Sequence, residues 1–307
     1  MIEARHLRML CAVAQTSSLT AAARELGCTQ PAVSQQMKAL ERSLGTPLLV
    51  RAGRGVRLTE AGEVLVRHAA GVLAGLQAAQ EEVASLAGLR GGRVRLVSFR
   101  SAASMLVPSA LASMRAAWPD VEVTMTESAP SRALDMLRKA DCDIVLTFRY
   151  PQMASVRGGS EATWDDLAVR PLLTDPLVAL VPDDHRLARA HRVKLTDLAD
   201  ESWVAGCPVC RRHVVDLCRS EGFTPRIDFA TDDYLTVIGL VRAGLGVAVL
   251  PEMAWQSLPT ESVSLLRLEP AVHREVVALT LPELTSVPAV RAMLHELSDT
   301  ARTREPA

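Results

Sequence analysis

The chain has 307 residues, with 34 Lys and Arg against 35 Asp and Glu and a formal net charge of −1. This length is enough for two or three domains with substantial cores. The sequence holds no run of about 20 apolar residues, which a membrane span requires, and its first residues lack the basic and apolar regions of a signal peptide. We therefore expect a cytoplasmic protein.

Positive charge is concentrated at the start of the chain. Residues 1–58 contain eight Lys or Arg and three Glu, a formal charge of +5, which leaves −6 for residues 59–307. A basic module on an acidic body is the charge distribution of a nucleic-acid-binding protein. Residues 1–58 are therefore the expected DNA-binding domain.

Within this module, the stretch from Leu19 to Leu44 predicts two helices separated by a tight turn. Ser18 is a suitable N-cap for the first helix, and Gly27 ends it. Thr29 can cap the second helix, and Pro31 is tolerated in its first turn because those backbone N–H groups lack intrahelical partners. The apolar residues of the first helix follow the period of one buried face: Leu19, Ala22, Ala23 and Leu26.

The second helix has an apolar face and a polar face. The apolar face is expected to be buried and consists of Val33, Met37, Leu40 and Leu44. The outward residues are hydrogen-bonding or cationic, with no carboxylate among them: Gln30, Ser34, Gln35, Lys38 and Arg42. Such a set suits base edges and phosphates in a major groove, so we interpret this helix as a recognition helix. The alternative is an ordinary helical hairpin with a solvated polar face.

A β-hairpin wing is predicted between Leu48 and Gly62. A flexible tip at 52–55 separates two short apolar runs, and the wing would carry Arg51, Arg54 and Arg57 towards phosphates. The candidate DNA-binding residues are these three arginines, the outward residues of the recognition helix, and Ser18, Thr29 and Pro31.

The run AAARELGCTQPAVSQQMKALERSLGTPLLVR, followed by LTEAG, is similar in spacing and composition to the N-terminal domain of LysR-type transcriptional regulators. One departure is Leu49, where that family usually has Phe. The segment VRAGLGVAVLP near residue 250 extends the resemblance over nearly the whole chain. The resemblance implies an α/β multidomain fold with a winged helix-turn-helix, a long linker helix and a two-lobed, periplasmic-binding-protein-like effector domain. It implies DNA, a small-molecule effector and RNA polymerase as candidate partners.

A long helix is expected from the N-cap Thr59 to about Leu86, within a linker of residues 59–90. Seven of its residues follow one another at alternating spacings of four and three: Leu65, Ala69, Val72, Leu76, Ala79, Val83 and Leu86. This heptad seam predicts a homodimer, whose paired helices would fix the distance between two DNA half-sites. The alternative is packing of the seam on the chain's own body. The resemblance, and not the spacing, implies further assembly into a homotetramer. A hinge is expected at Gly88, Gly91 and Gly92.

Strand-like and helix-like segments alternate through residues 91–301, the expected effector-binding domain, which is the pattern of a mostly parallel sheet covered by helices. The predicted strands are Arg93–Ser98, Val121–Thr126, Ile144–Phe148, Leu167–Leu173, Leu177–Val181, Trp203–Ala205, Arg226–Phe229, Val247–Leu250 and Glu275–Leu281. The predicted helices are Ser101–Ala117, Arg132–Ala140, Cys210–Ser220, Tyr234–Ala243 and Pro288–Asp299. Lobe 1 (residues 93–165 and 268–301) and lobe 2 (residues 166–267) would be joined by crossovers near 149–166 and 262–268.

Small ligands in such sheets bind beyond the carboxyl ends of strands, near helix N-termini. The residues at those positions are Arg100, Ser101, Ala102, Glu127, Ser128, Phe148, Arg149, Gly206, Cys207 and Thr231. Arg100 and Ser101 could hold the carboxylate of an effector, since a guanidinium and free helix N–H groups suit an anion. The alternative is that Arg100 pairs with Glu127.

The segment GCPVCRRHVVDLC, residues 206–218, is the feature that the fold requires least. Its Cys207-x-x-Cys210 pair at a helix start, followed by two arginines, favours a lowered thiol pKa. Zinc on Cys207, Cys210, His213 and Cys218 fits poorly, because the first and last lie about 16 Å apart on a straight helix. Structural or effector-lining thiols, redox sensing through Cys207, Cys210 and Cys218, and metal binding remain open, with no metal set predicted.

Two other functional classes compete with a DNA-binding regulator. A thiol oxidoreductase built on Cys207 and Cys210 would leave the basic helix-turn-helix and the heptad seam without a role, and the sequence predicts no catalytic residue set or resident cofactor. A solute-binding transport component would share the two-lobed body, but it should lack the first 90 residues. We therefore expect a regulator and no enzyme.

Overall fold

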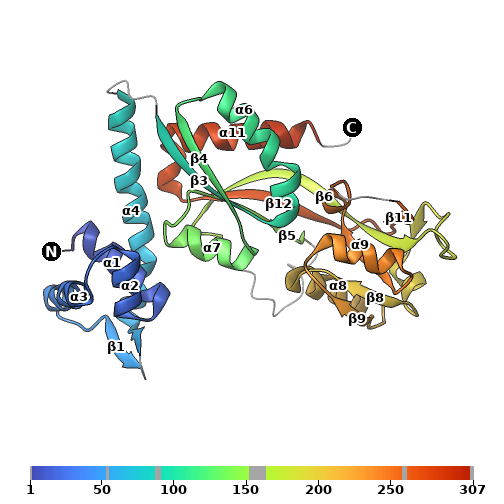
Figure 1. The fold of residues 1–307 in the computed structure, drawn as a ribbon, viewed down its shortest axis with the longest axis horizontal. Helices are drawn as coiled ribbons and strands as arrows, with labels where there is room; N and C mark the ends of the chain where they lie inside the picture. Colours follow the sequence, from blue (N-terminus) through green and yellow to red (C-terminus); the bar gives the residue numbers. More distant parts are fainter. Residues whose placement is uncertain (1, 53–54, 87–90, 152–163, 258–260, 305–307) are drawn as a thin grey trace.

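The structure is a computed structural model that describes residues 2–52, 55–86, 91–151, 164–257 and 261–304. The predicted wing residue Arg54, the hinge residue Gly88 and most of the crossover near 149–166 lie outside the described residues. A helical head occupies one end of the molecule, and a two-lobed α/β body occupies the other, with a long helix between them (Figure 1). No described helix is both long and apolar enough to cross a membrane.

Three helices form the head: α1 (Ala4–Thr16), α2 (Leu19–Glu25) and α3 (Gln30–Leu44). The caps expected from the sequence are present, because the Ser18 hydroxyl accepts from the Ala21 N–H at 3.3 Å and the Thr29 hydroxyl from the Ala32 N–H at 3.4 Å. The core of the head is fully buried at Leu10, Val33, Met37, Leu40 and Leu48. Leu44 was expected on the buried face but is 39% exposed, since α3 ends there and Gly45 turns the chain away at φ +69°.

The predicted wing is a two-stranded antiparallel hairpin of β1 (Leu49–Ala52) and β2 (Gly55–Leu58). The Glu41 carboxylate on α3 accepts the N–H groups of Leu48 and Leu49 at 2.8 and 3.1 Å, which fixes the base of the wing to the recognition helix. Gly55 is required at its position, because a Cβ atom there would lie 2.5 Å from the Ser17 carbonyl oxygen.

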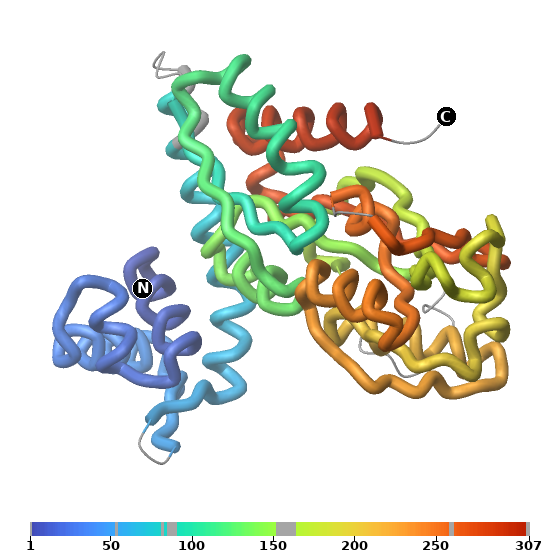
Figure 2. The backbone as a smooth tube through the Cα atoms, turned by 45° about the vertical axis from the view of Figure 1, so that its right-hand side comes forward, coloured from blue at the N-terminus to red at the C-terminus, as the bar shows by residue number. Residues whose placement is uncertain are grey.

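The linker helix α4 (Glu60–Leu86) begins where the Thr59 hydroxyl accepts the Gly62 N–H at 3.1 Å. It runs between the head and the body in both views (Figures 1 and 2). Small residues allow close packing on the body, and at Gly71 an added Cβ would meet the Glu283 carboxylate at 3.0 Å. The head also contacts lobe 1 directly, because the Gln15 amide donates to the Asp141 carboxylate at 2.6 Å.

Lobe 1 has three parallel strands, β3 (Gly92–Ser98), β4 (Val121–Glu127) and β5 (Ile144–Arg149), followed in the sheet by the antiparallel β12 (His273–Thr280). Its helices are α5 (Arg100–Met105), α6 (Val107–Ala117), α7 (Pro130–Arg138), α11 (Pro288–Arg302) and the short η3 (Pro282–Ser286). A single helix was predicted over Ser101–Ala117, but it breaks at Leu106, because Pro108 lacks an N–H group and clashes with the preceding turn.

One strand, β6 (Ala168–Pro182), passes through both lobes. The sequence predicts two strands there, and the structure corrects this to one. Its first part pairs with β12 of lobe 1, and its second part lies between β10 (Val247–Pro251) and β11 (Val263–Leu268) of lobe 2. The crossover predicted near 262–268 is therefore β11 itself, and the chain returns to lobe 1 only after Leu268.

Lobe 2 places β8 (Ser202–Ala205) between β10 and the edge strand β9 (Arg226–Ala230), all parallel where they pair. Its other elements are β7 (Arg192–Val193), η2 (Leu195–Leu198), α8 (Pro208–Ser220), α9 (Tyr234–Arg242) and α10 (Glu252–Trp255).

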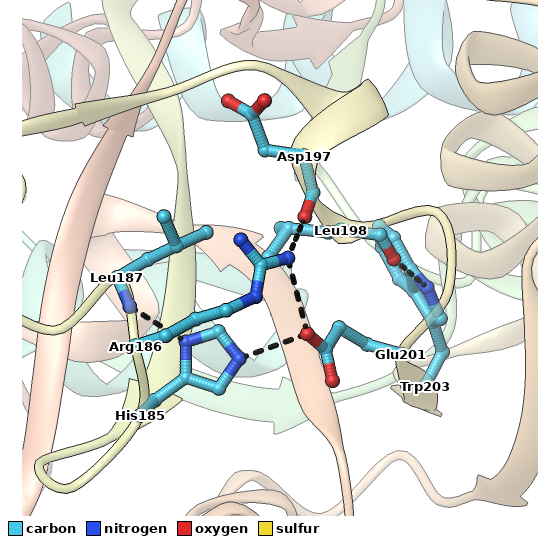
Figure 3. A network of polar contacts seen from close by, with 7 residues as sticks. All are labelled: His185, Arg186, Leu187, Asp197, Leu198, Glu201 and Trp203. Atoms are coloured by element: carbon cyan, nitrogen blue, oxygen red, sulfur yellow. Dashed lines mark hydrogen bonds and ion pairs between the residues drawn. The ribbon is translucent and has the colours of Figure 1, made fainter.

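A polar network secures the loops that lead into β8 (Figure 3). His185 Nε2 lies 3.1 Å from a Glu201 carboxylate oxygen, and Arg186 bonds to Glu201 and to the Asp197 carbonyl. The buried Trp203 indole donates to the Leu198 carbonyl at 3.1 Å. These bonds tie the loops before β8 to one another within lobe 2.

Candidate functional site

The outer face of α3 forms an open groove of about 830 Å³. Its lining contains all five outward residues predicted for the recognition helix, together with others, and comprises Gln30, Pro31, Ser34, Gln35, Lys38, Glu41, Arg42, Gly45, Thr46 and Pro47. Gln35, Lys38 and Arg42 are exposed, so their polar groups are available to a partner. Sequence reasoning missed Thr46 and Pro47, which follow the helix and carry no periodic signal.

Some of the remaining DNA-binding candidates cap helices of the head, and the others lie on the wing. Ser18 and Thr29 are occupied as helix caps through their hydroxyl groups. Arg51 pairs in register with Val56, and Arg57 pairs with Val50, so the two arginines point to opposite faces of the ribbon. Both are exposed. The structure thus presents cations on both sides of the wing, next to the groove of α3.

The predicted heptad seam of α4 is divided into two parts. Ala69 is fully buried in a small cluster with Leu7 and Cys11 of α1, and Leu65 packs against that cluster. Further along the helix, Val72, Leu76 and Val83 are 56, 40 and 66% exposed, and Ala79 is exposed as well. The side chain of Leu86 lies outside the described residues. The stripe Val72–Leu76–Ala79–Val83 is therefore an apolar surface that no described part of the chain covers.

A buried polar cluster lies where the two lobes meet. The Arg274 side chain is 0% exposed and donates to the Asp175 carboxylate at 2.7 and 2.8 Å and to the Ser101 hydroxyl at 2.7 Å. Its guanidinium carbon lies 5.0 Å from the Phe99 ring centre and 4.5 Å from that of Phe148. One arginine thereby joins β12 and β6 to the start of α5.

Asp175 completes this cluster towards lobe 2, because its second oxygen accepts the Met253 N–H of α10 at 2.9 Å. Burial raises the pKa of Asp175 above its ordinary value, although the neighbouring Arg274 partly offsets the shift. Burial by itself would lower the pKa of Arg274, because it disfavours the charged form. The Asp175 carboxylate outweighs this effect and holds the pKa of Arg274 above its usual range. The pair is therefore maintained by its own mutual attraction inside the protein.

Arg100 lies at the mouth of the junction, 42% exposed, and has two carboxylate neighbours. Its guanidinium is 3.2 Å from Glu127 of lobe 1 and 3.8 Å from Asp233 of lobe 2. The predicted alternative of a pair with Glu127 is thus present in this structure. Asp233 also caps α9, because its carboxylate accepts the Thr236 N–H at 3.1 Å, and hydrogen bonds from the Thr236 hydroxyl and N–H lower the pKa of Asp233.

The other predicted ligand positions have mixed environments. Ala102 is fully buried, whereas Ser128 is half-buried and lies directly after β4. Arg149 pairs with Glu275 at 2.6 Å and lies over the Trp164 ring. Phe148 is buried beneath Arg274, and Gly206, Cys207 and Thr231 follow the strands β8 and β9. Glu127, Ser128 and Thr231 are therefore placed beside Arg100 and its partners, while Arg149 is engaged elsewhere.

Cys207 and Cys210 occupy the first turn of α8. Cys207 is the N-cap, and its sulfur accepts the Cys210 N–H at 3.2 Å. A hydrogen bond from the Cys210 thiol lowers the pKa of Cys207 to about 6, whereas the same bond and burial raise that of Cys210 well above its usual value. Cys218 is fully buried further along the helix, and burial raises its pKa to about 12. No cluster of three or more metal-binding side chains occurs among the described residues.

Sequence reasoning missed Asp175, Arg274, Tyr150 and Tyr234 at the junction. A usable signal was present for the first two. Asp175 is the single charged residue of the apolar segment TDPLVALVP, and Arg274 and Glu275 are the charged residues at the start of the otherwise apolar strand HREVVALT. Charged residues are almost never fully buried unless they are paired. The two tyrosines carried no comparable local signal.

Comparison with known proteins agrees with this architecture. Residues 4–63 match the family model described as a bacterial regulatory helix-turn-helix protein of the lysR family, and residues 87–302 match the LysR substrate binding domain. A curated relative, the probable HTH-type transcriptional regulator LrrA of Synechococcus elongatus, is 31% identical over 96% of both chains.

Solved structures share the fold over the full length of the chain. A full-length OxyR variant from Pseudomonas aeruginosa has a TM-score of 0.71 at 23% identity, covering 98% of this chain and 95% of the other. Full-length CbnR in complex with its target DNA has a TM-score of 0.55 at 21% identity, covering 98% of this chain and 100% of the other.

Proposed function

Because the chain belongs to the LysR family of DNA-binding transcriptional regulators, we propose that a small effector bound at the lobe junction changes how its head holds operator DNA. The observation that carries this proposal is the position of Arg100, which contacts Glu127 of lobe 1 and Asp233 of lobe 2 at once. A ligand that replaces either carboxylate changes the balance between two arrangements of the lobes. It acts only to the extent that it binds one arrangement more tightly.

In this proposal, α3 lies in the major groove. Ser34 and Gln35 face base edges, and Lys38 and Arg42 face phosphates, since amide and hydroxyl groups read bases while cations neutralise the backbone. Arg51 and Arg57 of the wing contact the flanking phosphates, which gives affinity without sequence preference. The support is the open groove along α3 and the exposure of these side chains.

We further infer that the linker helices of two chains pair along Val72, Leu76, Ala79 and Val83. Exposed apolar residues at heptad spacing are typical of a coiled-coil seam. The covered residues Leu65 and Ala69 would then lie outside the seam and hold the head on its own linker. A tetramer and contact with RNA polymerase belong to the same proposal, as properties of the family architecture.

The effector class follows from the charge at the mouth of the junction. An organic acid would compete with Glu127 and Asp233 for the Arg100 guanidinium, and its carboxylate could also accept from backbone N–H groups at the start of α5. Ser128 directly follows Glu127, and the Thr231 hydroxyl accepts the Asp233 N–H at 3.1 Å, so both residues adjoin a carboxylate partner of Arg100 and could supply neutral hydrogen bonds. We therefore propose a carboxylate-bearing metabolite as the effector.

One observation favours a second input, through thiol oxidation. The Cys207 sulfur accepts the Cys210 N–H at 3.2 Å, and hydrogen bonding from Cys210 lowers the pKa of Cys207 to about 6. A thiolate next to a protonated thiol is an arrangement that oxidants attack. The relatives are named as transcriptional regulators, so we assign this pair to regulation and propose no enzymatic turnover.

DNA binding is tested by fluorescence anisotropy of the purified chain on a fragment from its own upstream intergenic region, against random duplex at the same salt concentration. We expect tighter binding to the upstream fragment and a shift in affinity when the effector is added. Equal affinity for both duplexes, with and without candidate metabolites, would overturn the proposal.

The effector class is tested by a thermal-shift screen of organic acids and amines. We expect an acid to stabilise the chain, and Arg100→Gln to abolish that shift. Arg115→Gln, which removes an exposed arginine of α6, is the matched control and should keep it. Stabilisation by amines alone would contradict a carboxylate effector.

Pairing of linker helices is tested by analytical ultracentrifugation at micromolar concentration. Leu76→Glu should produce monomers, because a charge would replace an apolar seam residue. Leu245→Glu, at a similarly exposed leucine in lobe 2, should leave the assembly unchanged. A Leu76→Glu protein with the mass of the original assembly would rule out this seam.

A further inference from the structure

The groove along α3 contains a carboxylate, which is unexpected on a surface that meets DNA. Of the ten residues that line the groove, Lys38 and Arg42 are cationic and Glu41 is the single acidic residue. Phosphate groups repel a carboxylate, so the charge of Glu41 lowers the affinity of this face for any duplex. Direct contact with the DNA backbone therefore does not explain why Glu41 lies there.

The Glu41 carboxylate is bound by backbone groups of the wing. One oxygen, Oε1, accepts the N–H groups of both Leu48 and Leu49, at 2.8 and 3.1 Å. Leu48 is only 1% exposed, and a buried N–H group needs an acceptor. Neither cation of the groove pairs with Glu41 among the described residues, and the Arg42 Nε donates to the Lys38 carbonyl at 3.2 Å instead. The carboxylate therefore serves the wing.

The rest of the wing is anchored on other helices. The Thr59 N–H donates to the Leu48 carbonyl at 2.9 Å, where α4 begins. On the second strand, the Val56 N–H donates to the Ser17 carbonyl at 3.0 Å, at the end of α1. Among the described hydrogen bonds, Glu41 thus makes the link between the wing and α3, whereas the other bonds hold the wing on α1 and α4.

This link lies close to the cations of the wing, whose first strand is labelled below the head in Figure 1. Arg51 comes two residues after Leu49 on β1, about 7 Å along a strand that rises about 3.4 Å per residue. Arg57 lies on β2 opposite Val50, so it moves with the same pair of strands. The direction of β1 at Leu49 therefore determines where both guanidinium groups lie relative to α3.

We propose that Glu41 is a positioning residue that sets the angle between the recognition helix and the wing. By holding the start of β1, it places Arg51 and Arg57 on the phosphates that flank the bases read by α3. This inference rests on the proposed function, because DNA binding is the property that the angle controls. The fixed geometry is obtained with a residue whose charge itself repels DNA.

Two substitutions at this position separate geometry from charge. Glu41→Gln removes the charge but keeps an Oε1 oxygen that accepts N–H groups, so β1 should stay in place. Glu41→Ala removes the charge and the acceptor together, so β1 should be released from α3. The two variants have the same net charge, and any difference between them reports the position of the wing.

The test is fluorescence anisotropy of the full-length variants on the upstream fragment and on random duplex, across a salt series. Glu41→Gln should bind all duplexes at least as tightly as the original protein, because a repulsive charge is gone. Glu41→Ala should bind all duplexes less tightly, and its slope of log affinity against log salt should fall by about 2 per bound head, one for each displaced arginine.

A second comparison shows whether this loss arises through the arginines. In the original protein, replacing Arg51 and Arg57 by Ala should lower the salt slope by about 2 per bound head. In Glu41→Ala the same replacements should change the slope little, because the arginines already lie away from the phosphates. Gln35 should keep its base preference in every variant, which shows that α3 remains folded.

The control is Glu261→Ala, which removes an exposed carboxylate of lobe 2 and changes the net charge by the same amount. It should bind every duplex as the original protein does. Weaker binding and a lower slope in this control would show that net charge, and not the wing, is being measured.

Three further results would overturn the positioning role. Equal salt slopes for Glu41→Gln and Glu41→Ala would leave only an effect of charge. A further fall in slope on replacing the arginines in Glu41→Ala would show that the wing is still in place. Loss of base preference together with the slope would show that Glu41 supports the fold of the head as a whole.

Failure of the proposed function is distinguishable from these results. If the original protein binds its upstream fragment no more tightly than random duplex, the regulator is wrong as proposed. The salt slopes on random duplex still compare Glu41→Gln with Glu41→Ala in that case, because phosphate contacts do not depend on sequence.

Discussion

The recognition face of the head and the junction of the two lobes are both polar, but they are built in opposite ways. On α3, Gln35 and Lys38 are exposed and lie over an open groove. At the junction, Arg274 and Asp175 are 0 and 3% exposed and bond to each other at 2.7 Å. The first region keeps its polar groups available to a partner, and the second uses them inside the protein.

This difference implies that substitutions in the two regions fail in different measurements. An exposed polar side chain can be removed with little change in the free energy of unfolding, so its loss appears in DNA affinity. A buried charge that loses its partner destabilises the fold, so its loss appears first in the free energy of unfolding. Variants of the two regions therefore separate binding from stability within one chain.

The largest expected effect is at Arg274. Arg274→Met leaves Asp175 buried and unpaired, which should lower the free energy of unfolding by about 3–5 kcal/mol. The double variant Arg274→Met with Asp175→Leu should recover much of that loss, because no charge then remains buried. Urea unfolding followed by circular dichroism measures both. If Arg274→Met were as stable as the original protein, the buried charge pair would not support the fold, and this contrast with the exposed face of α3 would be wrong.

A smaller effect, dependent on pH, is expected at His213. Burial lowers the pKa of His213 from 6.5 to about 4, so between these values the unfolded chain binds a proton that the folded chain does not. Stability should therefore fall as pH drops from about 6.5 towards 4, by at most about 1.4 kcal/mol per pH unit from this group. His213→Phe should flatten that acid limb in melting curves. The exposed His295→Phe is the control, and it should retain the slope.

On the exposed side, Gln35→Ala should cost about 1–3 kcal/mol of discrimination at one base pair and leave the unfolding curve unchanged. Arg57→Ala should instead weaken binding to all duplexes and reduce the slope of log affinity against log salt by about 1. Competition binding on single-base operator variants across a salt series distinguishes the two. Loss of stability in Gln35→Ala would show that the recognition face also supports the fold.

The smallest expected effect concerns Ser18, a candidate for DNA contact whose hydroxyl caps α2. Ser18→Ala should lower the stability of the head by about 1 kcal/mol, the usual value for a lost N-cap. Thermal unfolding measures this, with Ser43→Ala near the exposed end of α3 as the control. A drop in DNA affinity without any change in stability would move Ser18 from capping to direct contact.

Much of the head and the order of elements in the body could be predicted, because both depend on short-range patterns. Caps at Ser18 and Thr29, the turn at Gly27 and the buried period of α3 are encoded within a few residues of where they act. Errors occurred where local signals compete with distant contacts. Two strands were predicted where β6 is continuous, because pairing with β12, β10 and β11 carries the strand through Pro176.

In the linker helix, too, the local pattern predicts only part of the structure. The heptad spacing predicts an apolar seam, but it does not indicate which seam residues are buried within the chain. Ala69 is buried against α1, whereas Val83 is 66% exposed, although both occupy the same predicted seam. The distinction depends on where the head folds back along α4, which no pattern within the helix encodes.

The sequence by itself determined the helix-turn-helix, its basic charge, the linker and the spacing of the Cys207-x-x-Cys210 pair, since each depends on neighbours along the chain. Only the tertiary structure decided the junction. Arg274 meets partners 99 and 173 residues away, at Asp175 and Ser101. Contacts between residues so far apart leave no periodic pattern in the sequence. They are produced by the order of strands in the sheet and by the energetic cost of burying a charge without a partner.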